Sequence, residues 1–242
     1  MVCITAYDAV LGALADAAGA DLILVGDSVG NTVLGYSSTL PVSLEQMVHH
    51  TRATRQGVKH ALLVADLPFG SYQSSVGQAV DASVELIKAG AQAVKLEGAY
   101  TEAIAAIVRA GIPVMGHVGM TPQSVNAFGG FRVQGKGDAG SAVIEEAKQV
   151  EASGAFSIVL ELIPAQLAAQ ITDHLSIPTI GIGAGSHCSG QVQVIYDVLG
   201  LNQKPLKHAK PYLSGHDSIV SAIKEYSAEV RDGTFPSDKH SF

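Results

Sequence analysis

Four apolar runs of the chain are followed by acidic residues: Asp27, Asp66, Glu97 and Glu161. The run 22–25 is typical of a strand buried on both faces, and it continues into Gly-Asp-Ser-x-Gly. Carboxylates that gather at one place repel one another unless protons or a cation intervene. A divalent cation held by one or two acids, waters and substrate oxygens is the expected solution. The sequence therefore predicts a metal site of Asp27, Asp66 and Glu97, and the absence of zinc spacings such as H-E-x-x-H favours Mg²⁺. In the alternative reading, each acid caps a helix or pairs with a nearby base.

A lysine lies two residues before one of these acids. Because Lys95 and Glu97 are two apart on one expected strand, their side chains point to the same face. An inward lysine beside carboxylates and a metal is suited to hold a substrate carboxylate. The alternatives are a simple charge pair with Glu97 and Schiff-base chemistry. Schiff-base chemistry is disfavoured because the surrounding acids keep the amine protonated.

Two further residues at expected strand ends are suited to proton transfer. Glu161 lies among large apolar residues in the segment 157–164, and loss of solvation raises the pKa of a carboxyl group. We expect it to act as a base, although it could instead cap the helix expected over 164–175. His117 is suited to hydrogen-bond a substrate oxygen or to relay a proton. A structural role is the alternative for His117.

The elements that must position these residues alternate along the chain. Strands are expected at 2–6, 22–26, 61–65, 92–96, 113–119, 156–160, 178–182 and 192–196, and most of them are followed by a helix. Strict alternation implies parallel strands with right-handed crossovers. Eight such units favour a closed (β/α)₈ TIM barrel over an open doubly wound sheet, and active sites lie at the C-terminal ends of barrel strands.

The composition bounds the class of protein. With 242 residues, 47% hydrophobic and 15% charged, we expect one barrel domain over 1–242 with a helical extension at about 212–242. Ile219, Ile223, Tyr226 and Val230 form the apolar stripe of that extension. The net charge of −7 disfavours nucleic acid or an anionic membrane as a partner. Two cysteines and the lack of a visible signal peptide lead us to expect a cytoplasmic protein.

The chain resembles the ketopantoate hydroxymethyltransferase (3-methyl-2-oxobutanoate hydroxymethyltransferase) family over nearly its whole length. The segments that carry the resemblance are TAYD at 5–8, VGDSVG at 25–30, ADLPF at 65–69, VKLEG at 94–98, GHVGMTPQS at 116–124, FGGF at 128–131 and GIGAG at 181–185. The resemblance implies a barrel of the phosphoenolpyruvate-binding type and a magnesium-dependent one-carbon transfer in pantothenate synthesis. The co-substrate would be 5,10-methylenetetrahydrofolate, the acceptor 3-methyl-2-oxobutanoate, and the assembly a homo-oligomer, typically a decamer.

The resemblance also implies roles for individual residues. Asp27, Asp66 and Glu97 match the metal site of the family. Asp27, Ser28, Asp66 and Lys95 match contacts to the 2-oxo acid, and Glu161 matches the base.

The sequence departs from that family at two places. Family members carry a helical segment before the first strand that the sequence from Met1 does not include, and Ser189 stands where an Asp is common. Two other functions remain open at this stage. One is a magnesium-dependent carbon–carbon lyase or mutase acting on a 2-oxo acid. The other is a non-catalytic barrel for binding or assembly.

Overall fold

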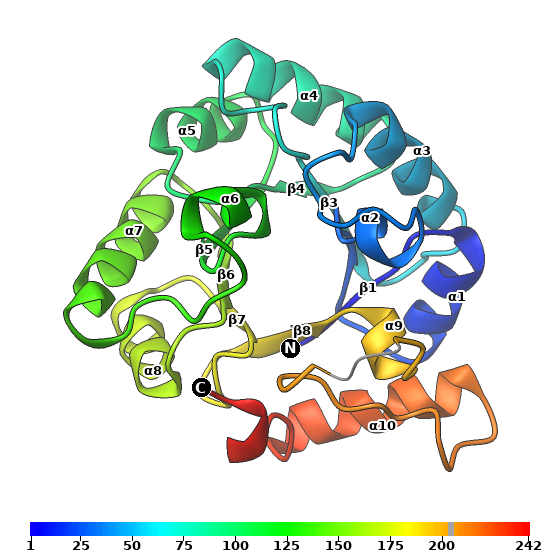
Figure 1. The fold of residues 1–242 in the computed structure, drawn as a ribbon. Coiled ribbons are helices and arrows are strands. Elements are labelled where there is room, and N and C mark those ends of the chain that lie inside the picture. The colour runs from blue at the N-terminus through cyan, green and yellow to red at the C-terminus, as the bar shows by residue number, and fades with distance from the viewer. Residues whose placement is uncertain (203–205) are drawn as a thin grey trace.

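The computed structural model describes residues 1–202 and 206–242, and within them eight parallel strands close into a barrel (Figure 1). The strands follow one another around the barrel in chain order, and the last one pairs with the first. This arrangement confirms the predicted (β/α)₈ barrel and excludes the open sheet. The strands are β1 Val2–Thr5, β2 Leu22–Val25, β3 Leu62–Asp66, β4 Ala93–Lys95, β5 Val114–Gly119, β6 Ser157–Glu161, β7 Thr179–Ile182 and β8 Gly190–Gln193.

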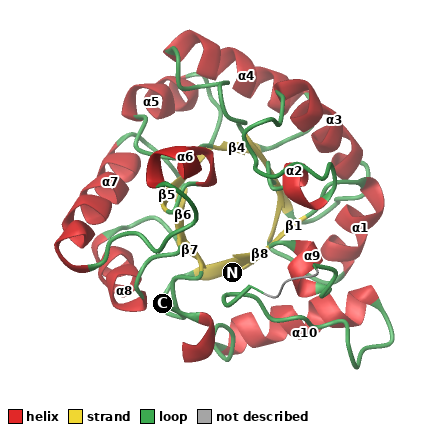
Figure 2. Ribbon diagram, in the orientation of Figure 1, coloured by secondary structure: helices red, strands yellow, loops and turns green. Residues whose placement is uncertain are grey.

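Helices surround the strands as an outer layer (Figure 2). The longer ones are α1 Ala9–Ala17, α3 Leu44–Arg55, α4 Val76–Lys88, α5 Thr101–Arg109, α7 Gly140–Ala152, α8 Ala165–His174 and α10 Ile219–Asp232. Three helices of one turn were not expected: α2 Val29–Thr32, α6 Val125–Phe128 and α9 Ile195–Val198. Asp8 caps the start of α1, because its carboxylate accepts a hydrogen bond of 2.8 Å from Leu11 N.

The interior of the barrel explains why the site residues face one another. Its apolar filling includes Val64, Ala93, Met115 and Val159, one residue from each of β3, β4, β5 and β6. Side chains two residues further along a strand point to the same face. The next inward positions on these strands are therefore the polar ones: Asp66, Lys95, His117 and Glu161.

The last strand was predicted wrongly in its bounds. The apolar run 192–196 was expected to be the strand, but β8 starts at Gly190 and the chain turns into α9 at Ile195. The register is set by β1, since Val2 lies opposite Gln191 and Gln191 N donates to Met1 O. A short apolar run is compatible with a strand and with a buried helical turn, and periodicity alone does not separate them.

The expected helical stripe in the C-terminal part forms the inner face of α10. Ile223 and Tyr226 are fully buried, and the Tyr226 hydroxyl donates to Cys3 O at 3.0 Å. The helix packs on the outside of the barrel against α1 and β1 (Figure 1). Across residues 1–202 and 206–242, we find no helix with the length and apolarity needed to cross a membrane.

Candidate functional site

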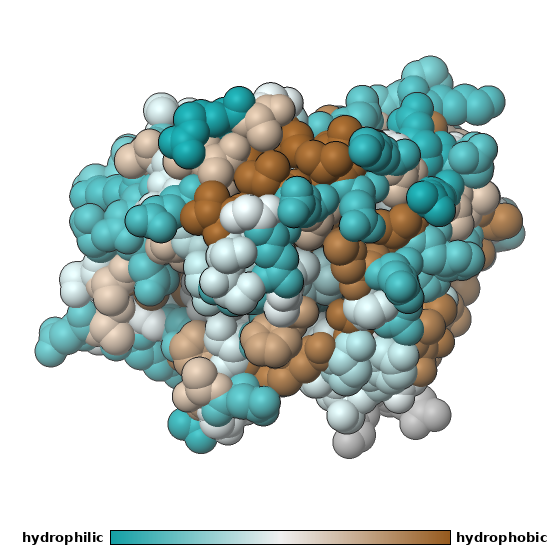
Figure 3. Space-filling view, turned by 90° about the horizontal axis from the view of Figure 1, so that it is seen from above, coloured by the Kyte–Doolittle hydropathy of each residue, from teal (hydrophilic) through white to brown (hydrophobic). Residues whose placement is uncertain are grey.

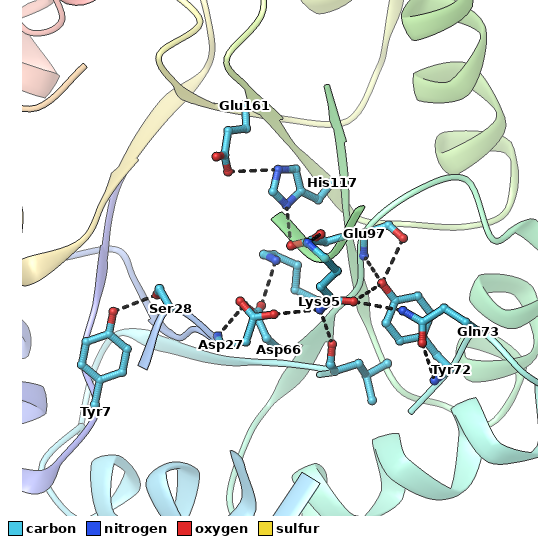
Figure 4. Close-up of polar contacts among 12 residues, drawn as sticks. Tyr7, Asp27, Ser28, Asp66, Tyr72, Gln73, Lys95, Glu97, His117 and Glu161 are labelled. Carbon is cyan, nitrogen blue, oxygen red and sulfur yellow. Dashed lines mark hydrogen bonds and ion pairs between the residues drawn. The ribbon is translucent and has the colours of Figure 1, made fainter. Parts of the chain in front are cut away.

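A cavity of about 560 Å³ opens at the C-terminal ends of the strands. Its lining contains all seven side chains singled out from the sequence, which come from the ends of five neighbouring strands (Figure 4). They are Asp27, Ser28, Asp66, Lys95, Glu97, His117 and Glu161. The structure thus brings the predicted site residues together, and the roles assigned to them remain predictions.

Lys95 and Asp66 form an ion pair across two neighbouring strands. Their Cα atoms lie opposite one another in the β3–β4 register, and Lys95 Nζ is 3.0 Å from Asp66 Oδ1. Burial disfavours the charged amine, but the carboxylates of Asp66, Glu97 and Asp27 outweigh this effect and raise the pKa of Lys95. Lys95 is therefore a fixed positive charge. The partner in its ion pair is Asp66 rather than Glu97, although Glu97 was the pairing considered from the sequence.

Asp27 is held against Asp66 by the backbone of the turn after β2. Asp27 N donates to Asp66 Oδ2 at 2.9 Å. A side chain at position 26 would displace the Ser28 hydroxyl, because a Cβ on Gly26 would lie 2.8 Å from Ser28 Oγ. Burial, and then the nearby Asp66 charge, raise the pKa of Asp27 to about 7. Ser28 Oγ lies 2.8 Å from the Tyr7 hydroxyl, which fixes it at the edge of the cavity.

His117 lies between two carboxyl groups. Its Nε2 is 3.3 Å from Glu161 Oε2 and its Nδ1 is 3.7 Å from Glu97 Oε1. Burial, and then the charge of Lys95, lower the pKa of His117 well below its usual value, so the ring is neutral. A neutral imidazole has one N–H, so it can donate to only one of the two acids.

Glu161 has the electrostatics expected of a base. Burial raises its pKa to about 7, although His208 and the charge of Lys95 oppose the shift. Its side chain is 14% exposed, so it remains open to the cavity. The alternative that Glu161 caps the following helix is wrong, because α8 begins at Ala165 after its N-cap residue Pro164 and has no side-chain cap.

The backbone around Glu161 is tightly constrained. Gly119 lies opposite Glu161 in the β5–β6 register with φ of 93°, and a Cβ there would lie 2.4 Å from Glu161 O. Met120 N donates to the same carbonyl oxygen at 2.8 Å. Leu162 follows with φ of 46°, a conformation that costs energy for a residue with a side chain. Strain of this kind is typical of functional sites, and it fixes where the Glu161 side chain starts.

Gln123 is a residue of the site that the sequence reasoning missed. Its Nε2 donates to Asp27 Oδ2 at 2.8 Å and its backbone N donates to Glu97 Oε2 at 2.9 Å. Its Oε1 accepts a hydrogen bond of 2.7 Å from the Tyr72 hydroxyl. Gln123 stands inside the family-like motif at 116–124, but its partners are distant in sequence, and only the fold brings them together.

Replacement of Gln123 by methionine tests this arrangement. Gln123 is 5% exposed, so Gln123→Met leaves buried acceptors on Asp27 and Leu67 without their donor. We expect the free energy of unfolding to fall by about 1–3 kcal/mol, measured by urea denaturation. Gln149→Met, at an exposed position of α7, is the matched control and should change stability by less than about 0.5 kcal/mol. Equal losses in both variants would contradict the role of Gln123.

The donor chemistry of the cavity fits magnesium. Four carboxyl groups share one lysine, and burial together with the Asp66 charge raises the pKa of Asp27, so a cation placed among these acids would be stabilised. Among the residues described, no three His, Cys, Asp or Glu side chains form a preformed metal site. The carboxylates instead contact Lys95, Gln123 and backbone N–H groups. Mg²⁺ generally takes only one or two carboxylates together with waters and substrate oxygens, so a preformed cage is not required.

Comparison with solved structures identifies the type of barrel. The structure of 2,3-dimethylmalate lyase, a PEP mutase/isocitrate lyase superfamily member, matches with a TM-score of 0.60 at 16% identity, over 100% of this chain and 86% of that one. A phosphonopyruvate hydrolase in complex with oxalate and Mg⁺⁺ matches with a TM-score of 0.61 at 16% identity, over 99% and 88%. At this level of identity the likeness is one of fold, and it confirms the predicted phosphoenolpyruvate-binding type of TIM barrel. The lyase or mutase alternative is supported by fold alone.

Comparison of the sequences identifies the family. The family model described as ketopantoate hydroxymethyltransferase matches residues 1–238. The 3-methyl-2-oxobutanoate hydroxymethyltransferase of Syntrophus aciditrophicus is 54% identical over 99% of this chain and 90% of its own length. These matches cover the barrel and every residue of the cavity described above. The chain is therefore an enzyme that belongs to the ketopantoate hydroxymethyltransferase family.

Proposed function

We propose that this enzyme transfers a hydroxymethyl group from 5,10-methylenetetrahydrofolate to 3-methyl-2-oxobutanoate. Water is consumed, and the products are 2-dehydropantoate and tetrahydrofolate. The observation that carries the proposal is one cavity in which a buried lysine, four carboxyl groups and a neutral histidine face one another, in a member of this family. A fixed cation beside a high-pKa carboxylate is suited to an anionic substrate from which a proton must be removed.

In this proposal different side chains of the cavity bind the substrate, remove a proton and hold the metal. Lys95 and Ser28 hold the carboxylate of the oxo acid, which points its C3 toward Glu161. Glu161 removes the C3 proton, and the electron pair left on C3 forms the bond to the methylene carbon. The two bonds from that carbon to folate nitrogens break, water supplies the hydroxyl group, and the two nitrogens take up the remaining proton of water and the proton removed from C3. Asp27, Asp66 and Glu97 are the residues that would hold magnesium. When bound, magnesium supplies a Lewis acid for the negative charge that develops on the carbonyl oxygen.

His117 orients the Glu161 carboxylate and the substrate. The neutral ring has one proton to donate, and neither ring nitrogen has a hydrogen-bond partner among the residues described; the nearest carboxyl oxygen is that of Glu161 at 3.3 Å. Donation to Glu161 fixes that carboxylate, and the other nitrogen then remains an acceptor. Once substrate is bound, we infer that the same N–H can donate to a substrate oxygen, as predicted from the sequence.

Exchange of the C3 hydrogen separates the candidate functions. With magnesium and without folate, the enzyme should exchange the C3 hydrogen of 3-methyl-2-oxobutanoate with deuterated water, as measured by proton NMR. Addition of 5,10-methylenetetrahydrofolate should then give 2-dehydropantoate. A lyase or mutase would convert a 2-oxo acid without folate. Absence of both exchange and transfer would refute the proposal.

Asp66 is the residue through which magnesium dependence can be tested. Asp66→Asn keeps the shape and one acceptor for Asp27 N, but it removes a negative charge beside Lys95. We expect the magnesium concentration for half-maximal C3 exchange to rise by about tenfold or more, because a carboxylate ligand is lost. Asp138→Asn, in the exposed turn Gly137–Ala139, is the matched control. An unchanged magnesium dependence in Asp66→Asn would count against its role as a ligand.

We also propose a homo-oligomer, with the decamer implied by the family resemblance, in the cytoplasm. Figure 3 shows hydrophobic residues gathered between hydrophilic ones on the side of the barrel seen from above. Apolar surface of this kind is suited to contacts between subunits.

A further inference from the structure

We propose that the outer part of the catalytic cavity is a subsite for the folate co-substrate, in which Phe131 stacks on the pterin ring and Arg132 and Lys207 bind the carboxylates of the glutamate tail. The inference rests on the proposed function and deepens it. It assigns a role to three residues that neither the sequence motifs nor the acid chemistry of the inner cavity explains.

The size of the cavity is the first argument. An oxo acid of about eight non-hydrogen atoms fits among the inner polar side chains, whereas cavities of 300–1,000 Å³ are typical of much larger ligands. The cavity of about 560 Å³ extends outward past the acids to a second set of residues. This outer lining comes from the loop after α6, from the end of β8 and the segment that follows it, and from the end of the chain. It includes Phe131, Arg132, Val133, Gln193, Asp197, Leu206, Lys207, His208 and Phe242.

The outer lining exposes large apolar groups to solvent. Phe131 is 60% exposed and Leu206 is 44% exposed, and both line the cavity. Exposed apolar groups that gather at the mouth of a cavity indicate a surface that a ligand covers. A flat heterocycle such as pterin suits this surface, because an aromatic side chain stacks on its π-face.

The charge of the outer lining is opposite to that of the inner site. The inner cavity holds four carboxyl groups and one lysine, while the outer lining holds Arg132 and Lys207, both exposed, and, among the described residues, a single acid, Asp197, in a chain of net charge −7. The tail of tetrahydrofolate carries carboxylates, which would be repelled by the inner acids and attracted by these two cations. The charge pattern therefore orients the co-substrate with its tail outward.

Lys207 also builds the wall of the subsite. Its Nζ lies 4.4 Å from the centre of the Phe242 ring and donates to Ser241 O. A lysine ammonium has three donors, so it can still bind a carboxylate. At the neighbouring residue, His208 O accepts a hydrogen bond of 3.0 Å from Gln193 Nε2, and Gln193 Oε1 has no hydrogen-bond partner among the residues described. A pterin carries ring and amino N–H groups, for which this oxygen is an available acceptor.

The reaction requires the two ligands to share one cavity. A methylene carbon is transferred only when it lies next to C3 of the oxo acid. The inner and outer linings are continuous, so a folate seated outward of the oxo acid meets this requirement without displacing it.

Calorimetric titration with tetrahydrofolate, in the presence of magnesium and 3-methyl-2-oxobutanoate, tests the subsite. We expect Phe131→Ala and Lys207→Met to lower the affinity by about tenfold, the loss typical of one stacking or charged contact. The matched controls are Phe69→Ala, an exposed phenylalanine outside the cavity, and Lys136→Met, an exposed lysine four residues after Arg132. Unchanged affinity in both test variants would overturn the inference.

Titration with a second ligand measures the contribution of the glutamate tail to binding. Tetrahydropteroate lacks the glutamate, so Lys207→Met and Arg132→Met should weaken tetrahydrofolate binding and leave tetrahydropteroate binding unchanged. Equal losses for the two ligands would refute the assignment of these cations. The folate-free exchange of the C3 hydrogen, measured on the same variants, reports on the oxo acid alone. Lack of exchange in the unmodified enzyme refutes the proposed function, whereas loss of exchange in Phe131→Ala alone places Phe131 in the inner site and refutes only the subsite.

Discussion

Glu161→Gln is expected to reduce both C3 exchange and product formation by about 100- to 10,000-fold, the contribution typical of a general base. Glutamine keeps the size of the side chain and its polar contact with His117 Nε2, which lies 3.3 Å away. It cannot take up a proton at neutral pH. We therefore expect calorimetry to show that 3-methyl-2-oxobutanoate still binds with magnesium, so that the loss is in kcat rather than in affinity.

The pH dependence of the reaction provides an independent measurement. Burial raises the pKa of Glu161 to about 7, and a base acts in its ionised form. For exchange, kcat/KM should therefore rise with pH up to about 7 and level off above it. This rise should be absent in the residual activity of Glu161→Gln.

Glu145→Gln, at an exposed position of α7, is the control for the loss of one carboxylate elsewhere. Its activity and its pH profile should match those of the unmodified enzyme. Full exchange activity in Glu161→Gln would remove this residue from the mechanism. His117 would then be the next base to consider, although its lowered pKa makes it a weak one.

The barrel and the acids at the C-terminal ends of its strands could be predicted, because both depend on local patterns of apolar and polar residues. Alternating strands and helices specify parallel pairing, and the apolar runs that end in Asp66 and Glu161 place those acids at the same end of the barrel. The period of two along a strand adds the direction of the side chains, since Lys95 and His117 follow inward apolar residues by two positions.

The contacts within the site could not be read from the sequence, because they depend on register and on long-range packing. Lys95 lies two residues from Glu97, yet the β3–β4 register places it opposite Asp66. Gln123 reaches Asp27 across 96 positions of the chain. The bounds of β8 depend in the same way on its pairing with β1. Local periodicity contains no information about any of these three.

Lys95→Met is expected to have the largest effect on stability. Lys95 and Asp66 are 5% and 3% exposed and lie 3.0 Å apart. Removal of one partner of a buried ion pair leaves an uncompensated charge, which costs about 3–5 kcal/mol. The loss should be visible in urea denaturation. In addition, substrate affinity should fall, because in the proposed mechanism Lys95 holds the carboxylate of the oxo acid.

The loss should depend on pH and on magnesium. Lys95 lowers the pKa values of Asp27 and Glu97, which burial otherwise raises, so its removal raises them further. Acids with pKa values raised by folding bind protons more tightly in the folded protein, and stability falls as the pH rises through those values. The destabilisation by Lys95→Met should therefore be larger at about pH 8 than at about pH 5, and added magnesium should restore part of it by supplying positive charge.

Two further variants test whether the loss of stability in Lys95→Met comes from the unpaired buried charge. Lys148→Met removes an exposed lysine of α7 and should change stability by less than about 0.5 kcal/mol at either pH. The double variant Lys95→Met, Asp66→Asn removes both charges, and it should be more stable than Lys95→Met alone because the unpaired carboxylate is gone. If Lys95→Met is as stable as the control at both pH values, the ion pair does not compensate the buried acids. The case for a cation-deficient site that attracts magnesium would then fail as well, because both arguments depend on the same buried negative charge.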